Sequence, residues 1–175
     1  MQREEIEHVL RAAAAISREN SFVLVGSQAV ALLLDAPPAE LLVSTEIDLY
    51  PSLHPEKSGL IDGAIGALST FHDTFGYHAD GVGPETAVLP PDWMQRAQFF
   101  YFGEVTAICP DLHDLAASKC VAFRDKDADF VRVLLRHGLI QLSTLLERIA
   151  LLNLAEPVAR KTIEWAQRRA SEATA

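Results

Sequence analysis

The sequence predicts an α/β protein: a small sheet flanked by helices, followed by a C-terminal helical bundle. Two observations carry this prediction. Over the first 109 residues, short apolar runs alternate with amphipathic segments, and the pattern closes in a hairpin around Gly103. From Asp111 onward every segment has helical periodicity. We therefore expect an α/β core over residues 1–109 and a helical bundle over residues 110–175, packed together as one compact unit.

The first part of the chain predicts a helix, a strand and a second helix. Residues 3–18 form an amphipathic segment. Its apolar stripe consists of Ile6, Val9, Leu10, Ala13 and Ile16. "SFVLVG" is typical of a short buried strand, and "SQAVALLL" predicts a helix that begins at Ser27. Residues 35–38, "DAPP", end that helix.

Two more strands and one long helix are expected before the hairpin. "STEIDLYP" is a strand that Pro51 ends. The segment from Pro55 predicts a single helix, with Gly76 just past its end. "YHADGV" is a strand closed by glycine, and "PETAVLPPDWMQRA" is loop and turn. "QFFYFGEVTAICP" supplies the hairpin.

Four helices are expected after the hairpin. They are "DLHDLAASKCVAFRD", "KDADFVRVLLRHG", "QLSTLLERIALL" and "PVARKTIEWAQRRASEA". No repeat, low-complexity tract or linker interrupts the sequence.

Composition and charge exclude several classes of protein. Hydrophobic residues make up 49% of the chain and charged residues 22%, which is ordinary for a globular protein. The acidic N-terminal segment is unlike a signal peptide, and no apolar run approaches the ~20 residues that span a bilayer, so no membrane partner is expected. Cys109 and Cys120 lack metal-ligand spacing, which favours a reducing cytoplasm.

The charge is unevenly distributed along the chain. Residues 1–95 carry 14 acids and 4 basic residues, a net of −10, whereas residues 96–175 carry 10 acids and 11 basic residues, a net of +1. This polarity fits a metal-holding acidic half beside a phosphate-tolerant half. Chance variation over a solvated surface explains it equally well.

Gly26 and Ser27 stand where the first strand passes into a helix. Glycine allows a ligand to approach the backbone closely, and the free N–H groups of a helix start favour phosphate. The Ser27 hydroxyl would add a donor. A plain helix N-cap, which serine often fills, is the alternative.

Glu46 and Asp48 share one face of a strand, about 7 Å apart, because side chains alternate along it. Their mutual repulsion is relieved by a divalent cation, and Mg²⁺ typically takes one or two carboxylates plus substrate phosphates. A wet edge strand, or pairing with Arg or Lys, is the alternative. Asp80 would complete a carboxylate trio if its strand lies beside this one, and His78 lies on the same face as Asp80. Otherwise Asp80 is an ordinary turn residue before glycine.

Lys119 lies on the apolar stripe of the first C-terminal helix. Its ammonium either reaches outward to water or points into a cleft, where a compact charge suits a triphosphate. The charged segment "FRDKDADF" follows directly. In that segment Asp127 is either an N-cap among surface charges or part of a nucleotide site.

The order of these signals resembles the nucleotidyltransferase superfamily signature. That signature is an apolar residue, Gly-Gly or Gly-Ser, a helix, and a strand with two acids separated by one residue. Here "VLVGSQAVALL" precedes "TEIDLYP". "FGYHADGVGPETAVLPPDW" and "DLHDLAASKCVAFRDKDADFVRVLL" resemble AbiEii-like proteins and their DUF6036-type relatives. The resemblance covers roughly residues 20–150.

The resemblance implies a minimal polymerase-β-like mixed sheet flanked by helices, with a C-terminal bundle. It implies Mg²⁺ or Mn²⁺ as cofactor and a nucleoside triphosphate (NTP) as substrate. The residues it assigns are Glu46, Asp48 and Asp80 for the metal; Gly26, Ser27, Lys119 and Asp127 for the nucleotide; and Glu46, Asp48, Asp80 and Lys119 for catalysis. Some AbiEii relatives modify the acceptor end of tRNA and are encoded beside antitoxins. An RNA (tRNA) or protein acceptor and an antitoxin partner are therefore expected.

One residue departs from the signature. Glu46 stands where most active nucleotidyltransferases have aspartate, and Mg²⁺ demands near-ideal octahedral geometry. The leading hypothesis is a Mg²⁺-dependent nucleotidyltransferase acting on a hydroxyl acceptor. A catalytically impaired nucleotide- or protein-binding relative is the second hypothesis, and a purely structural helical partner is the third.

Overall fold

The computed structural model of the protein describes residues 1–174 and divides into two compact units. The sheet unit comprises Met1–Thr86 and Ala97–Pro110. The helical unit comprises Ala87–Arg96 and the residues described from Asp111 onward. The segment that precedes the hairpin in sequence therefore belongs with the C-terminal helices.

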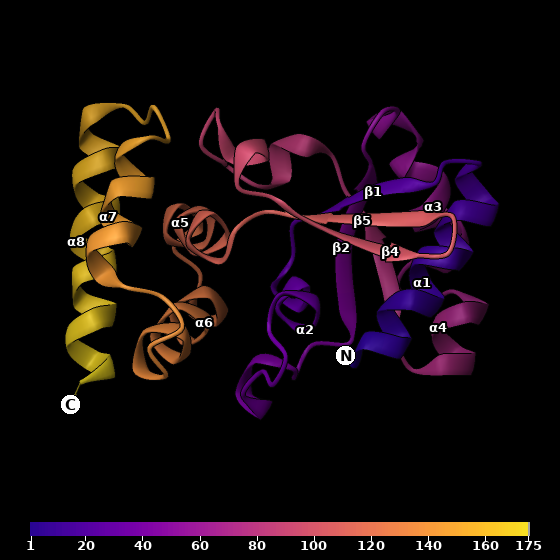
Figure 1. Ribbon diagram of the computed structural model, residues 1–175, viewed down its shortest axis with the longest axis horizontal. Coiled ribbons are helices and arrows are strands. Elements are labelled where there is room, and N and C mark those ends of the chain that lie inside the picture. The colour runs from indigo at the N-terminus through magenta and orange to yellow at the C-terminus, as the bar shows by residue number, and fades with distance from the viewer. Residues whose placement is uncertain (175) are drawn as a thin grey trace. The chain divides into compact units, whose positions relative to one another are not determined.

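Five strands form one mixed sheet in the order β3-β2-β1-β5-β4 (Figure 1). Their bounds are Ser21–Leu24 for β1, Glu46–Pro51 for β2, His78–Gly81 for β3, Gln98–Phe102 for β4 and Val105–Cys109 for β5. β1 pairs antiparallel with β2 and parallel with β5, β2 pairs parallel with β3, and β4 pairs antiparallel with β5. The predicted fold class is confirmed, including the hairpin, where Gly103 has a φ of 66°.

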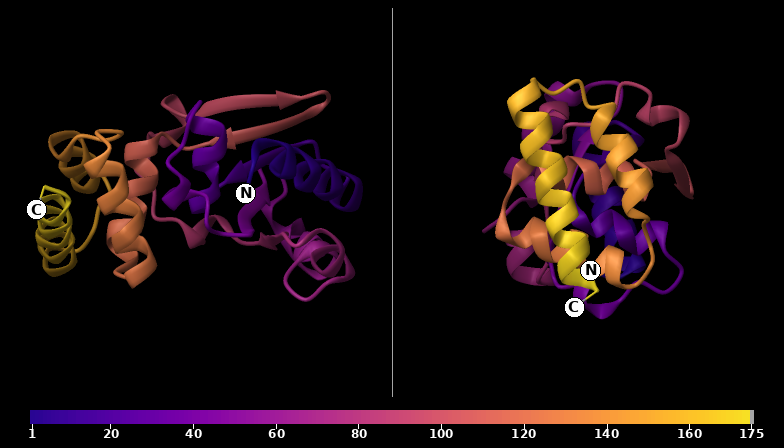
Figure 2. Two further views of the ribbon diagram at one scale, coloured as in Figure 1. Left: turned by 90° about the horizontal axis from the view of Figure 1, so that it is seen from below. Right: turned by 90° about the vertical axis from the view of Figure 1, so that its left-hand side faces the viewer.

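Four α-helices accompany the sheet. They are α1 (Arg3–Ser17), α2 (Val30–Leu33), α3 (Ser58–Ile65) and α4 (Thr70–Phe75). α1 buries four residues of its predicted apolar stripe, whereas Ile16 is only half-buried, and it packs on α3 and β5, beside the hairpin (Figure 2, left). α3 packs on β3 and β2. On β2, the alternate residues Ile47 and Leu49 are fully buried, so the other face of that strand carries its acids.

The single helix expected after Pro55 is instead broken in two. A 3₁₀ turn, η3 (Pro55–Lys57), leads into α3, and α4 begins only after residues 66–69. Gly66 is extended, and a Cβ there would lie 2.2 Å from the Asp62 carbonyl oxygen, so a side chain does not fit. Ser69 then caps α4 by accepting a hydrogen bond from the His72 N–H at 3.1 Å. The prediction of one helix was wrong because it overlooked this glycine break and the serine cap that follows it.

Over the residues described, the helical unit contains four α-helices. They are α5 (Leu112–Ala122), α6 (Asp125–Arg136), α7 (Leu142–Ala150) and α8 (Glu156–Ala173). α7 and α8 lie side by side (Figure 2, right), and α8 also packs on α6. All four were expected from the sequence. Within residues 1–174, no helix combines the length and the apolar character that crossing a bilayer requires.

A buried carboxylate ties the loop segment to these helices. Asp114 is fully buried and accepts hydrogen bonds from Arg96 Nε at 3.0 Å and Arg96 Nη2 at 3.2 Å. Arg148 Nε lies 3.2 Å from the same carboxylate. Arg96 also binds both oxygens of Asp92, at 2.7 and 2.9 Å. The two arginines neutralise an acid that burial would otherwise penalise.

Candidate metal centre

The pairing of β2 with β3 creates the site. These strands run parallel, and their register sets Glu46 opposite His78 and Asp48 opposite Asp80. Because side chains alternate along a strand, all four polar groups lie on one face of the sheet. Ala79, between the two polar residues of β3, is fully buried. The condition set by the sequence, that the Asp80 strand lies beside the Glu46 strand, is met.

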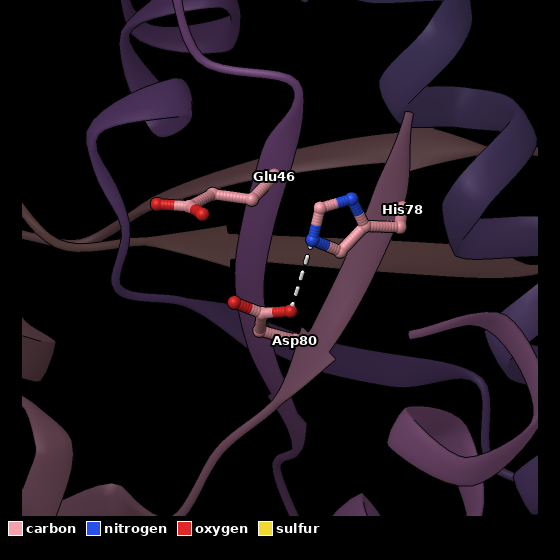
Figure 3. A group of neighbouring side chains, drawn as sticks. All are labelled: Glu46, His78 and Asp80. Carbon is pink, nitrogen blue, oxygen red and sulfur yellow. Dashed lines mark ion pairs between the residues drawn. The ribbon is translucent and has the colours of Figure 1, made fainter. Parts of the chain in front are cut away.

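Three of these side chains gather closely enough to hold one ion. One donor atom from each of Glu46, His78 and Asp80 lies within 4.8 Å of the other two. The Nε2 edge of His78 faces Asp80 Oδ1 at 3.2 Å (Figure 3). The His78 side chain is only 8% exposed, whereas that of Asp80 is 33% exposed. A buried imidazole therefore stands beside a carboxylate that is partly exposed to solvent.

The chemistry of these donors fits a divalent cation. Two carboxylates supply negative charge and hard oxygen ligands, as Mg²⁺ and Mn²⁺ prefer. The imidazole adds a nitrogen donor. Glu46, His78 and Asp80 are the residues that would hold the ion.

Asp48 lies close to the Gly-Ser turn. A Cβ built on Gly26 would lie 2.3 Å from Asp48 Oδ2 and 3.0 Å from its Cγ. Gly26 has φ −80° and ψ 172°, which any residue adopts, so glycine is needed here for space and not for conformation. The backbone also joins these elements, since the Val25 N–H donates to the Asp48 carbonyl oxygen at 3.0 Å. Two separate parts of the sequence signature are therefore in contact.

The helix after Gly26 is shorter than expected. A 3₁₀ turn, η1 (Ser27–Ala29), leads into the single turn of α2. Gly26 occupies the N-cap position, so Ser27 is not the plain N-cap considered from the sequence. Gln28 is fully buried, and its side-chain amide donates to the Leu41 carbonyl oxygen at 3.1 Å. This hydrogen bond links η1 to the segment that precedes β2.

Lys119 and Asp127 are brought together within the helical unit. Lys119 Nζ lies 3.5 Å from Asp127 Oδ1, and Arg124 Nε donates to Asp127 Oδ2 at 2.6 Å. The side chains of Asp127 and Lys119 are 2% and 11% exposed. Arg124, not Asp127, is the N-cap of α6, so the alternative of a capping aspartate is wrong. Lys119 and Arg124 therefore both form ion pairs with the buried carboxylate of Asp127.

His78 is the residue that sequence reasoning left out of the site. Strand alternation already placed it on the same face as Asp80, but histidine lies outside the carboxylate signature. The register of β2 against β3 puts it directly opposite Glu46. That register depends on tertiary pairing, which the sequence pattern does not specify.

The fold and this acid-bearing face together define a nucleotidyltransferase-like α/β protein. A family model described as nucleotidyltransferase of unknown function, DUF6036, matches residues 4–167. The chain belongs to this family, as the motifs predicted. No curated protein and no solved structure is detectably similar to it.

Proposed function

We propose that this protein is a divalent-metal-dependent nucleotidyltransferase that moves a nucleoside monophosphate from an NTP to a hydroxyl acceptor. The observation that carries the proposal is the β2–β3 register, which pairs Glu46 with His78 and Asp48 with Asp80 on one face. Membership of a nucleotidyltransferase family supports it. Mg²⁺ or Mn²⁺ is the proposed cofactor, held by Glu46 and Asp80, with Asp48 beside them.

In the proposed reaction the acceptor oxygen forms a bond to the α-phosphorus of the NTP. The bond from that phosphorus to the oxygen leading to the β-phosphate breaks, and pyrophosphate leaves. The proton of the acceptor hydroxyl passes to a carboxylate, for which the partly exposed Asp80 is the candidate. A cation held by these residues would supply positive charge to offset that of the phosphates.

The nucleotide-binding groups form a further part of the proposal. The backbone at Gly26 and the hydroxyl of Ser27 contact the triphosphate, beside the Asp48 carboxylate. The resemblance to the family further assigns a phosphate-neutralising role to Lys119, which forms an ion pair with Asp127. Asp127 limits the rotational freedom of that ammonium, which lowers the entropic cost of presenting it.

The acceptor is proposed from the resemblance to AbiEii-like proteins. An RNA, in particular tRNA, or a protein supplies the hydroxyl, and an antitoxin is the proposed regulatory partner. The more basic C-terminal part of the chain, with a net charge of +1 against −10 for residues 1–95, is compatible with a polyanionic acceptor. Two free buried cysteines suit the proposed cytoplasmic location.

The test uses each of the four α-³²P-labelled NTPs with Mg²⁺ or Mn²⁺, together with total RNA or cell protein. Wild type is expected to transfer label to a macromolecule with release of pyrophosphate. Asp48→Asn and Asp80→Asn are expected to abolish transfer, while Asp73→Asn, which removes an exposed acid of α4, leaves it unchanged. Absence of labelled product with all four NTPs and both metals would refute the proposed activity.

Glu46 favours a second function, that of a non-catalytic nucleotide-binding module. The glutamate side chain is longer by one methylene than the expected aspartate, which displaces its carboxylate. Calorimetry separates the two functions. Nucleotide binding that is independent of metal, without turnover, supports the binding module, whereas metal-dependent binding with turnover supports the transferase.

A further inference from the structure

We infer that His78 is a direct ligand of the cation and makes this site prefer Mn²⁺-class transition-metal ions to Mg²⁺. The inference rests on the proposed function for the use of a cation at this face. It goes further by replacing an all-carboxylate ligand set with Glu46, His78 and Asp80. It also gives the departure at position 46 a physical reason.

The geometry points to His78 and not to Asp48 as the third ligand. One donor atom each of Glu46, His78 and Asp80 lies within 4.8 Å of the other two. Among the described residues, the group that meets this distance does not include Asp48. The Asp48 carboxylate is instead turned toward Gly26. Glu46 and His78 are direct cross-strand partners, so the two side chains project side by side from neighbouring strands. The extra methylene of glutamate lets its carboxylate reach an ion shared with the imidazole.

The imidazole is positioned by its surroundings. His78 is 6% exposed, and its ring lies against that of His72 with 4.4 Å between centroids and 38° between planes. This contact and the burial restrict rotation of the ring. Its Nε2 is directed at the cluster, where it meets Asp80 (Figure 3).

The second ring nitrogen of His78, Nδ1, bears on which tautomer can bind an ion. Nδ1 of His78 is buried and has no hydrogen-bond partner among residues 1–174. In histidine ligands, the hydrogen bond of the second nitrogen sets which nitrogen carries the proton. Here Nε2 faces the Asp80 carboxylate at 3.2 Å, so Nε2 offers its lone pair to an ion only in the tautomer that carries the proton on Nδ1.

A nitrogen ligand changes which ion the site favours. Mg²⁺ is a hard ion that prefers oxygen ligands and keeps several waters. Mn²⁺ accepts carboxylates and also imidazole, and the later first-row ions bind nitrogen more strongly still. Replacing one carboxylate by imidazole also removes a negative charge, which lowers the affinity for Mg²⁺. The ligand set therefore selects for ions that accept nitrogen.

The test measures metal binding directly, without nucleotide. Mn²⁺ is titrated into the protein and followed by loss of the free-ion EPR signal, and Mg²⁺ affinity is obtained by competition. Electron spin echo envelope modulation of bound Mn²⁺ reports any coordinated nitrogen. The variants are His78→Asn and, as a matched control on the neighbouring ring, His72→Asn.

Wild type is expected to bind Mn²⁺ about tenfold or more tightly than Mg²⁺ and to show nitrogen modulation. His78→Asn is expected to lose the modulation and about tenfold in Mn²⁺ affinity, while His72→Asn keeps both. Bound Mn²⁺ without nitrogen modulation in wild type, equal affinity for the two ions, or no saturable binding would overturn the inference. The wild-type spectrum decides the matter even where a variant folds poorly.

The result is separable from the test of activity. If bound Mn²⁺ shows nitrogen coupling but the protein transfers no nucleotide, His78 is a metal ligand and the proposed transferase activity is refuted. If the protein transfers nucleotide but its bound Mn²⁺ shows no nitrogen coupling, the transferase activity is supported and the ligand role of His78 is refuted.

Discussion

Replacing Gly26 by alanine tests the contact between the Gly-Ser turn and the acid-bearing strand. The added methyl would lie 2.3 Å from Asp48 Oδ2, whereas ordinary contacts begin at 3.4 Å, so the carboxylate must move by about 1.1 Å (3.4 minus 2.3). The obstacle is the end of a flexible side chain, so the carboxylate swings aside and the backbone stays in place. The substitution therefore acts on the orientation of Asp48.

The expected effects on activity and on stability differ. A displacement of about 1 Å at a reacting centre costs on the order of 100-fold in rate, equivalent to about 2.7 kcal/mol of barrier. The backbone at Gly26 suits alanine, which adds about 0.4–1 kcal/mol of stability through the unfolded chain and offsets part of the local strain. The free energy of unfolding is therefore expected to change by less than about 1 kcal/mol.

The assay combines nucleotide transfer with urea unfolding of the same preparation. Gly63→Ala is the matched control, because Gly63 lies inside α3 and nothing stands within 4 Å of the position that its added methyl would occupy. It is expected to stabilise the protein by about 0.8–1 kcal/mol without changing transfer. Wild-type transfer by Gly26→Ala, at unchanged stability, would show that the Asp48 carboxylate need not lie where the structure has it.

Three further predictions concern the helical unit and the thiols. Asp114→Asn leaves Arg96 and Arg148 without their buried counter-charge, so the free energy of unfolding in urea is expected to fall by about 3 kcal/mol. A decrease below about 1 kcal/mol would contradict a stabilising role for these ion pairs. Burial alone would raise the pKa of Asp111, but the hydrogen bonds and charge of His113 lower it below 3.8. A carboxyl whose pKa is lowered in the folded state stabilises the fold at pH values above its unfolded-state pKa. Asp111→Ala is therefore expected to lower the free energy of unfolding by about 1 kcal/mol at pH 7, and by progressively less as the pH falls below 3.8. A difference in unfolding free energy that does not change with pH would argue against this. Burial raises the pKa of the Cys120 thiol to about 12 and also raises the pKa of the Cys109 thiol. A disulfide reagent at pH 8 is therefore expected to label either cysteine only after the protein unfolds. Rapid labelling of the folded protein would contradict the burial of these thiols.

The sequence predicts most of the fold because its local signals agree with one another. The apolar stripe of α1 and the alternation in β2 specify each element without reference to the rest of the chain. The break at Gly66 was missed since the apolar pattern runs on through it. Here a backbone contact with Asp62, and not the pattern, decides where α3 ends.

The site was predictable only up to the point where strand pairing matters. Alternation placed Glu46 and Asp48 on one face, and His78 and Asp80 on another strand. Which residue stands opposite which depends on the register of β2 against β3, which emerges from packing. The closeness of Gly26 to Asp48 likewise follows from the fold and not from the spacing of the motif.

A crystal of the protein with Mn²⁺ and a non-hydrolysable NTP tests the central claim most directly. Anomalous scattering at the manganese edge locates the ion without assumptions about its ligands. The proposed chemistry predicts a peak within coordinating distance of Glu46, His78 and Asp80, with the α-phosphate of the nucleotide bound to the same ion. A peak elsewhere, or a nucleotide bound away from these side chains, would contradict it.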